Sequence, residues 1–205
     1  MIKKISILTL LTLSSIHANQ DLKPMIQMGY DFGGTTLATI ERDGYYDSDI
    51  NKIRAGQGLS FEVGAVVDNP NMELQFLVGY KFDQESASNG EVTWDMIPFT
   101  AVALFKSNRW KFGGGLTYHL NPELLGSFTG YDTDGKYFND KADDTYENAI
   151  GGVVQVQYMV TDNFSMGLKG TFIEYQLKED NSITANGNAI GINFSYAFGE
   201  RSRYR

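Results

Sequence analysis

The chain has 205 residues, a formal net charge of −8 at pH 7 and no cysteine. This length suits a single domain. The excess of acidic residues argues against a nucleic-acid-binding protein, because such binding depends on cationic contacts to phosphate. Without cysteine an exported chain forms no disulfides, so its architecture alone must hold it together.

The N-terminus has the pattern of a secretory signal. Lys3 and Lys4 precede the apolar run 5–13, and Ala18 is a small residue at the expected cleavage position. The apolar run is too short to cross a bilayer as a helix. We therefore predict a signal peptide over residues 1–18 and one domain over residues 19–205. No later segment resembles a spanning helix, so any crossing of a membrane must use strands.

Eight later segments alternate apolar with small or polar residues at period two, which is the pattern of β-strands. In chain order they cover about 25–40, 58–67, 72–82, 92–105, 110–119, 150–158, 164–172 and 189–198. The third alternates most cleanly, with Phe76 and Tyr80 on one face and Gln75 and Lys81 on the other. The fourth has no clear phase, and Pro98 within it predicts an irregular pairing.

The connections between these strands alternate in length. Long polar segments follow the first, third, fifth and seventh strands, at about 41–52, 84–91, 121–145 and 178–187, whereas tight turns follow the second, fourth and sixth. Outer-membrane barrels have this asymmetry, with long loops outside and short turns in the periplasm. The aromatic residues predict one girdle at each end of the barrel. The girdle near the tight turns holds Phe105, Trp110, Phe112, Tyr158, Phe164, Tyr196 and Phe198, and the girdle near the long loops holds Tyr80, Phe82, Trp94, Tyr118 and Phe172.

A soluble up-and-down barrel with an internal ligand is the main structural alternative. In such a barrel the apolar face of each strand would line a pocket, and nothing would require aromatic girdles at both rims. The loop lengths and the girdles favour an all-β fold, an eight-stranded antiparallel up-and-down transmembrane barrel.

The last strand carries a family resemblance. Gly191, Phe194, Tyr196 and Phe198 form the pattern Gly-x-x-Phe-x-Tyr-x-Phe, which resembles the C-terminal insertion signal of bacterial outer-membrane barrels. With the signal, the turn at 161–163 and the hairpin rhythm, the chain resembles the small eight-stranded outer-membrane barrel superfamily, which includes the OmpA and OmpX barrels and the outer-membrane protein W type. The resemblance implies the outer membrane of a Gram-negative bacterium, contact with its lipid and lipopolysaccharide, and the barrel-assembly machinery as a partner.

The inward face of the predicted barrel mixes charges of both signs. An eight-stranded barrel is only just wide enough for its side chains to fill it, so these charges should pair into a polar plug. The predicted network comprises Asp31, Arg54, Glu62, Glu73, Lys81, Lys111 and Lys169. We therefore expect a non-enzymatic, cofactor-free barrel with a structural or surface-interaction role and an extracellular ligand at the long loops. The alternative is a conduit for small solutes or, as the resemblance to the protein W type implies, for small apolar molecules.

Two weaker sites complete the sequence predictions. Asp132, Asp134 and Asp140 could bind calcium, although they lack the spacing of an EF-hand loop and a solvated acidic loop explains them more simply. His119 and Glu123 suggest a third function, that of a lipid-modifying barrel enzyme, because small barrels that deacylate lipid A use a His, a Ser and an acid at the outer rim. Asn121 stands where that family places its Ser, so we predict no catalytic residue.

Overall fold

The computed structural model describes residues 21–43, 48–87, 90–131 and 137–199, and all its regular elements are β-strands. The strands are β1 (Asp21–Gly33), β2 (Thr36–Asp43), β3 (Ser48–Arg54), β4 (Gly58–Asp68), β5 (Met72–Ala87), β6 (Gly90–Ser107), β7 (Trp110–Tyr131), β8 (Tyr137–Thr145), β9 (Ala149–Met159), β10 (Phe164–Phe172), β11 (Glu174–Gln176), β12 (Thr184–Asn186) and β13 (Ala189–Ala197). The described residues contain no helix with the length and apolarity needed to cross a membrane.

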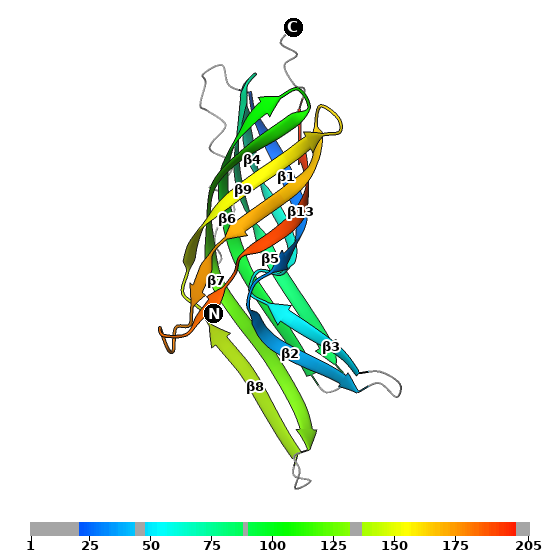
Figure 1. The fold of residues 1–205 in the computed structure, drawn as a ribbon, viewed down its shortest axis with the longest axis vertical. Helices are drawn as coiled ribbons and strands as arrows, with labels where there is room; N and C mark the ends of the chain where they lie inside the picture. The colour runs from blue at the N-terminus through cyan, green and yellow to red at the C-terminus, as the bar shows by residue number, and fades with distance from the viewer. Residues whose placement is uncertain (1–20, 44–47, 88–89, 132–136, 200–205) are drawn as a thin grey trace.

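Eight of these strands close into an antiparallel barrel. Its wall is formed, in order, by β6, β5, β4, β1, β13, β10, β9 and β7, and β7 also pairs with β6 (Figure 1). The first and last strands meet, with Met25 opposite Ala197 and Gly33 opposite Ala189. The predicted eight-stranded up-and-down barrel is confirmed.

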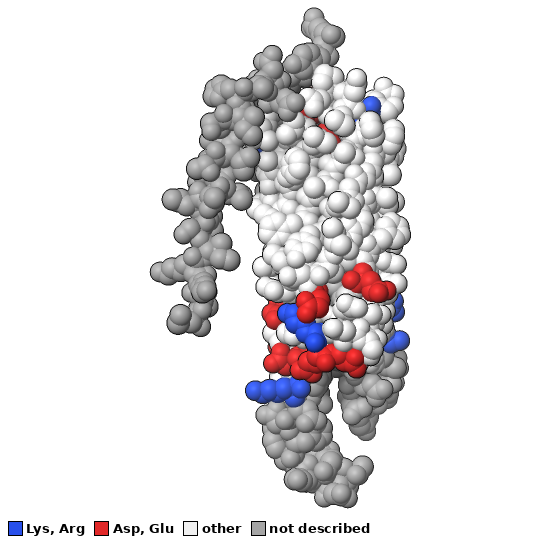
Figure 2. All heavy atoms as spheres, turned by 90° about the vertical axis from the view of Figure 1, so that its left-hand side faces the viewer, with Lys and Arg blue, Asp and Glu red and all other residues white. Residues whose placement is uncertain are grey.

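The wall has its apolar face outside. Phe76 is 52% exposed and Leu116 is 60% exposed, whereas their inward neighbours Gln75 and Thr117 are almost completely buried. Figure 2 shows the consequence on one face, where a broad band lacks charged side chains and acidic and basic residues gather near one end. A soluble barrel would bury its apolar residues instead, so this arrangement belongs to a barrel that faces lipid.

The two ends of the barrel differ. Tight turns at 69–71, 108–109 and 160–163 connect the strands at one end, which we call the periplasmic end. At the other, outer end the strands continue as hairpins (Figure 1). The predicted loop at 84–91 is mostly strand, because β5 reaches Ala87 and β6 begins at Gly90, and β7 and β8 likewise form a hairpin within 121–145. Outside the bilayer both faces of a strand meet water, so these extensions need no apolar alternation.

The pairing around Pro98 is irregular, as predicted. Between β5 and β6 the register passes from Val78–Phe99 directly to Lys81–Met96, and the β6–β7 register shifts between Asp95 and Ile97. On β7 the shift coincides with Asn121, whose φ is 47°. The extra residue reverses which side chains of β7 point inward.

Trp94 corrects the predicted outer girdle. It is completely buried, because it shares the inward face of β6 with Val92 and Met96. Tyr80, Tyr118 and Phe172 do face outward near the outer end, each at least 40% exposed. At the periplasmic end Phe105, Trp110 and Phe198 are exposed in the same way.

Candidate functional site

The lumen is closed at several levels, beginning at the periplasmic end. Asp68 on β4 forms ion pairs with Lys23 of β1, at 3.4 Å, and with Lys106 of β6. Lys106 also donates a hydrogen bond to the carbonyl oxygen of Asn69, at 2.8 Å. The sequence prediction missed this cluster. Extending the inward alternation by one position beyond Val66 and Leu104 would have reached Asp68 and Lys106.

The next level is an ion pair between β5 and β7. Lys111 Nζ lies 2.9 Å from Glu73 Oε1, and both side chains are about 2% exposed. Gln75 Nε2 donates to the same carboxylate oxygen at 2.7 Å. This level therefore joins a buried charge pair to a buried amide.

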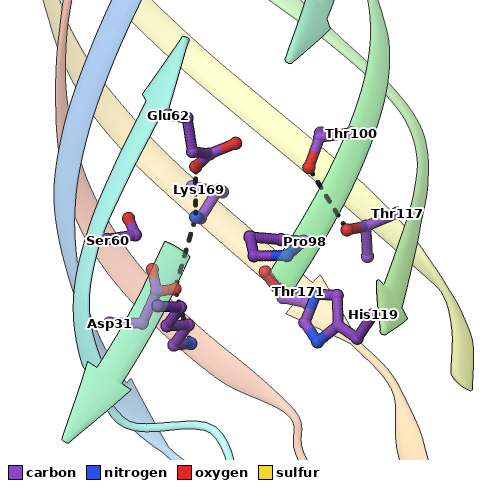
Figure 3. Close-up of a pocket in the computed structure, with 10 residues that line it drawn as sticks. Asp31, Ser60, Glu62, Pro98, Thr100, Thr117, His119, Lys169 and Thr171 are labelled. Atoms are coloured by element: carbon purple, nitrogen blue, oxygen red, sulfur yellow. Dashed lines mark hydrogen bonds and ion pairs between the residues drawn. The ribbon is translucent and has the colours of Figure 1, made fainter. Parts of the chain in front are cut away.

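A larger network occupies the outer half of the lumen. Asp31 Oδ2 accepts from Lys81 at 2.8 Å and pairs with Lys169 at 3.3 Å. Lys169 lies between Asp31 and Glu62 (Figure 3), with 3.9 Å to Glu62 Oε1. Gln27 donates to Glu62 at 3.4 Å, which extends the network along β1 toward the periplasmic end.

Arg54 does not belong to this network, which corrects the prediction. It is the last residue of β3 and pairs with Thr36 of β2. Those two strands form a small sheet of their own outside the barrel wall. The alternation of residues 48–54 therefore says nothing about the lumen. The other six predicted residues, Asp31, Glu62, Glu73, Lys81, Lys111 and Lys169, all lie inside.

A small cavity lies beside the network. Asp31, Lys169 and His119 are among the residues that line it (Figure 3), and its volume is about 10 Å³. A water molecule needs at least that much space. The side chains at this level thus leave room for about one water.

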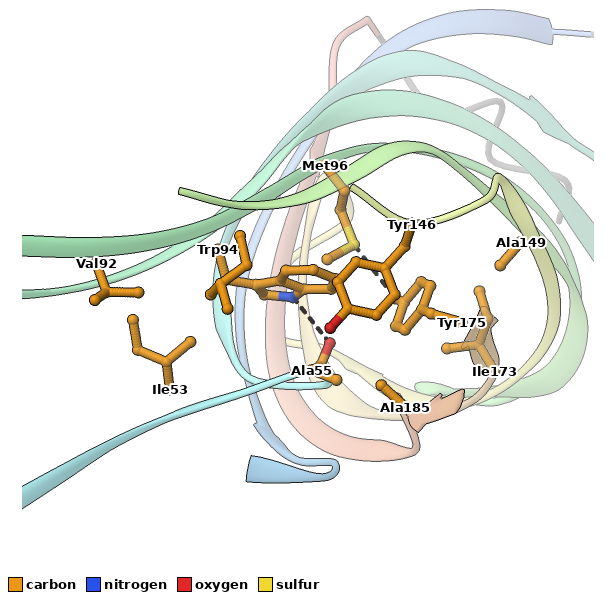
Figure 4. Close-up of a cluster of buried hydrophobic side chains, with 11 residues drawn as sticks. Ile53, Ala55, Val92, Trp94, Met96, Tyr146, Ala149, Ile173, Tyr175 and Ala185 are labelled. Carbon is orange, nitrogen blue, oxygen red and sulfur yellow. Dashed lines mark hydrogen bonds between the residues drawn. The ribbon is translucent and has the colours of Figure 1, made fainter. Parts of the chain in front are cut away.

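Above the network, a cluster of buried apolar residues fills the outer mouth of the barrel (Figure 4). We call it the outer cap, and it comprises Ile53, Ala55, Val92, Trp94, Met96, Leu124, Tyr146, Ala149, Ile173, Tyr175 and Ala185. The indole ring of Trp94 meets the rings of Tyr146 and Tyr175 edge to face, at centroid distances of 5.3 and 5.4 Å. Trp94 Nε1 also donates to the carbonyl oxygen of Ala55 at 3.0 Å.

The structure does not bring His119 and Glu123 together. His119 points inward, and its Nδ1 lies 2.6 Å from the hydroxyl of Tyr175, which also lies 3.4 Å from Met96 Sδ. Glu123 lies beyond the irregularity at Asn121 and is on the outward face of β7. The two residues of the predicted rim site therefore lie on opposite faces of β7.

The predicted calcium site falls largely outside the described residues. Asp132 and Asp134 are not among them, and Asp140 lies on β8 opposite Phe128 of β7. Within the part of the chain that the structure describes, no three His, Cys, Asp or Glu residues are placed to hold a metal ion.

The residues of the C-terminal pattern divide between the two faces of the wall. Phe194, Tyr196 and Phe198 point outward and are 37%, 39% and 44% exposed. Gly191 points inward beside Asp31, where a Cβ atom would lie 1.9 Å from Oδ1. The aromatic set thus faces lipid, and the glycine leaves space for the ion network.

Comparison with known proteins gives a family and several solved barrels. The family model described as "Outer membrane protein beta-barrel domain" matches residues 5–198. Similar structures include Ail of Yersinia pestis, solved with the heparin analogue sucrose octasulfate, with 11% identity, a TM-score of 0.49 and coverage of 88% of this chain and 100% of Ail. Outer membrane protein H of Pseudomonas aeruginosa has 11% identity, a TM-score of 0.47 and coverage of 86% and 99%. Neisserial surface protein A has 13% identity, a TM-score of 0.41 and coverage of 86% and 97%. No curated protein matches the sequence.

Proposed function

The chain belongs to the family of outer membrane protein β-barrel domains and lies in the bacterial outer membrane, and from this premise we propose that it is a non-conducting barrel whose outer hairpins form an interaction surface. Its role is non-enzymatic. Its surroundings are outer-membrane lipid and lipopolysaccharide, its insertion uses the barrel-assembly machinery, and its ligand is extracellular.

The observation that carries the proposal is the closure of the lumen in series. An ion must pass the cluster around Asp68, the Lys111–Glu73 pair, the network around Asp31 and then the outer cap. The charges at these levels are paired and are buried or, around Asp68, partly buried, and separating buried partners is costly. The cap adds a layer of mostly apolar side chains, which replaces little of an ion's hydration shell.

The surface role rests on the length of the strands. β5, β6 and β7 have 16, 18 and 22 residues, whereas about 9–11 residues suffice for one crossing of a membrane. The surplus residues lie at the outer end, where β7 continues with β8 beyond the barrel (Figure 1). A barrel that served only to span the membrane would need no such extensions.

Single-channel recording in planar bilayers tests the proposal. We expect no discrete conductance steps from the folded protein. Recovery of the protein with the vesicles that form the bilayer checks separately that it has inserted. The alternative, a conduit for small solutes, predicts discrete steps that change in Lys81→Ala or Glu73→Ala. Steps of that kind would overturn the proposed closure.

A further inference from the structure

The outer cap is assembled from two kinds of element. Trp94, Met96 and Leu124 come from β6 and β7, which belong to the barrel wall. Ile53 and Tyr175 come from β3 and β11, which pair only with β2 and β12 in two separate two-stranded sheets. These two small sheets are therefore not part of the wall's ladder. Besides packing and side-chain contacts, a backbone hydrogen bond from Glu147 N to the carbonyl oxygen of Gln176, at 2.8 Å, ties β11 to the segment after β8.

One lumen side chain contacts the turn that follows the β2–β3 sheet. Lys81 Nζ donates to Asp31 Oδ2 at 2.8 Å and also to the carbonyl oxygen of Gly56 at 2.7 Å. Gly56 follows Ala55 in the turn after β3, and the carbonyl oxygen of Ala55 is the one that accepts from Trp94. Lys81 is 4% exposed, so this double contact is shielded from water.

A second lumen side chain contacts the β11–β12 sheet. His119 on β7 contacts the hydroxyl of Tyr175 on β11, at 2.6 Å. The two small sheets are also joined to each other. Thr35 N, just before β2, donates a hydrogen bond of 2.7 Å to the carbonyl oxygen of Asn186 at the end of β12. A shift of one sheet would therefore disturb the other.

The β2–β3 hairpin leaves and re-enters the wall through glycines. Gly34 before β2 and Gly58 at the start of β4 have φ values of 88° and 143°, which side-chain-bearing residues rarely adopt. At Gly34 a Cβ atom would lie 2.3 Å from the backbone nitrogen of Gly56. Both ends of the hairpin thus pass through positions suited to a change of backbone angle.

We propose that Lys81 latches the outer cap to the lumen, so that the charge arrangement around Asp31 sets how often the cap opens at the cell surface. While Lys81 is paired with Asp31, its ammonium group is held beneath the carbonyl of Gly56. When that ammonium is absent or displaced, the buried carbonyl loses its charged donor and the closed position of the hairpin loses stability. A non-conducting barrel needs no such movement, so this inference goes beyond the proposed function.

Thiol labelling tests the latch, because the natural chain has no cysteine. Ala55→Cys places a single thiol in the cap, at a position that is completely buried. Its labelling rate by a membrane-impermeant maleimide on intact cells reports opening of the cap. We expect slow labelling of Ala55→Cys alone and labelling about tenfold faster or more when Lys81→Met is added, as loss of a charged hydrogen bond implies.

Lys111→Met is the matched control. It also removes a buried lysine from a carboxylate pair of nearly the same length, 2.9 Å against 2.8 Å, but on the periplasmic side of the network. We expect it to change the labelling rate by less than about twofold. An equal increase in both lysine variants would show general loosening of the barrel, and no increase in Lys81→Met would show that the cap is held without it. Either result overturns the proposal.

Tyr175→Phe keeps the test decisive if Lys81→Met does not fold. This variant removes only the hydroxyl that His119 contacts and leaves all ion pairs in place. If lumen side chains hold the outer cap closed, Ala55→Cys should be labelled faster in this variant as well, and an unchanged rate would contradict the proposal. The result is independent of the conductance experiment, since a cap can open above a lumen that stays closed.

Discussion

Lys111 Nζ and Glu73 Oε1 lie 2.9 Å apart although β6 separates their strands, so the ion pair crosses the lumen from β7 to β5. Neither side chain is more than about 2% exposed. Glu73→Ala leaves Lys111 without its carboxylate, and breaking a buried pair in this way costs about 3–5 kcal/mol. We expect the free energy of unfolding in detergent micelles to fall by that amount, measured by urea titration.

A paired replacement separates charge from packing in this prediction. Glu73→Leu combined with Lys111→Met removes both charges and keeps similar volume, so it should recover most of the lost stability. If the free energy of unfolding of Glu73→Ala lies within about 1 kcal/mol of that of the unaltered protein, the pair is more hydrated than its burial indicates.

Two glycines of the wall should respond in opposite directions to alanine. A Cβ atom at Gly191 would lie 1.9 Å from Asp31 Oδ1, whereas a Cβ at Gly152 would meet nothing within 4 Å. Gly191→Ala should therefore displace Asp31 and destabilise the barrel by about 1–3 kcal/mol. Gly152→Ala should stabilise it by about 0.5–1 kcal/mol, because alanine loses less backbone freedom on folding. Equal stabilities of the two variants in urea unfolding would contradict the close contact at Gly191.

The wall could be predicted from the sequence because lipid and lumen impose opposite demands on alternate residues. Phe76 and Tyr80 must face lipid, and Lys81 must avoid it, so the period of two is strong wherever a strand crosses the membrane. The same reasoning placed Asp31, Glu62 and Lys169 inside. That these charges pair with others, though not which ones, follows from a lumen too narrow to leave charges apart.

The outer end could not be predicted in the same way. Strands beyond the membrane have water on both faces, so the segment 84–91 reads as a loop although it pairs as β5 and β6. The sequence predicts Trp94 as a girdle residue because Met96, Ile97 and residues 101–105 are apolar in both registers, which hides the phase of its strand. Tyr175 was missed because β11 has only 3 residues, too few for a period to show, and Glu123 changed face because of the extra residue at Asn121.

The two tryptophans should report different surroundings. Trp94 is completely buried in the outer cap, whereas Trp110 is 52% exposed on the lipid-facing surface. In vesicles of brominated lipid, Trp94→Phe, which keeps only Trp110, should lose most of its fluorescence. Trp110→Phe, which keeps only Trp94, should keep most of it. Equal quenching in the two variants would contradict the inward position of Trp94.

The hairpin between β11 and β12 should carry an acid-sensitive contact. Asp180 Oδ1 accepts hydrogen bonds from Ser182 Oγ at 2.6 Å and from Ser182 N at 2.9 Å, and these bonds lower the pKa of Asp180. Because the folded-state pKa is depressed, the stabilisation is present above the ordinary aspartate value of about 3.9 and is lost as pH falls through the lowered pKa. Ser182→Ala removes the hydroxyl and should move the NMR titration midpoint of Asp180 upward, whereas Ser182→Thr, which keeps a hydroxyl, should leave it low. A midpoint that stays the same in Ser182→Ala would mean that the backbone bond alone sets the pKa.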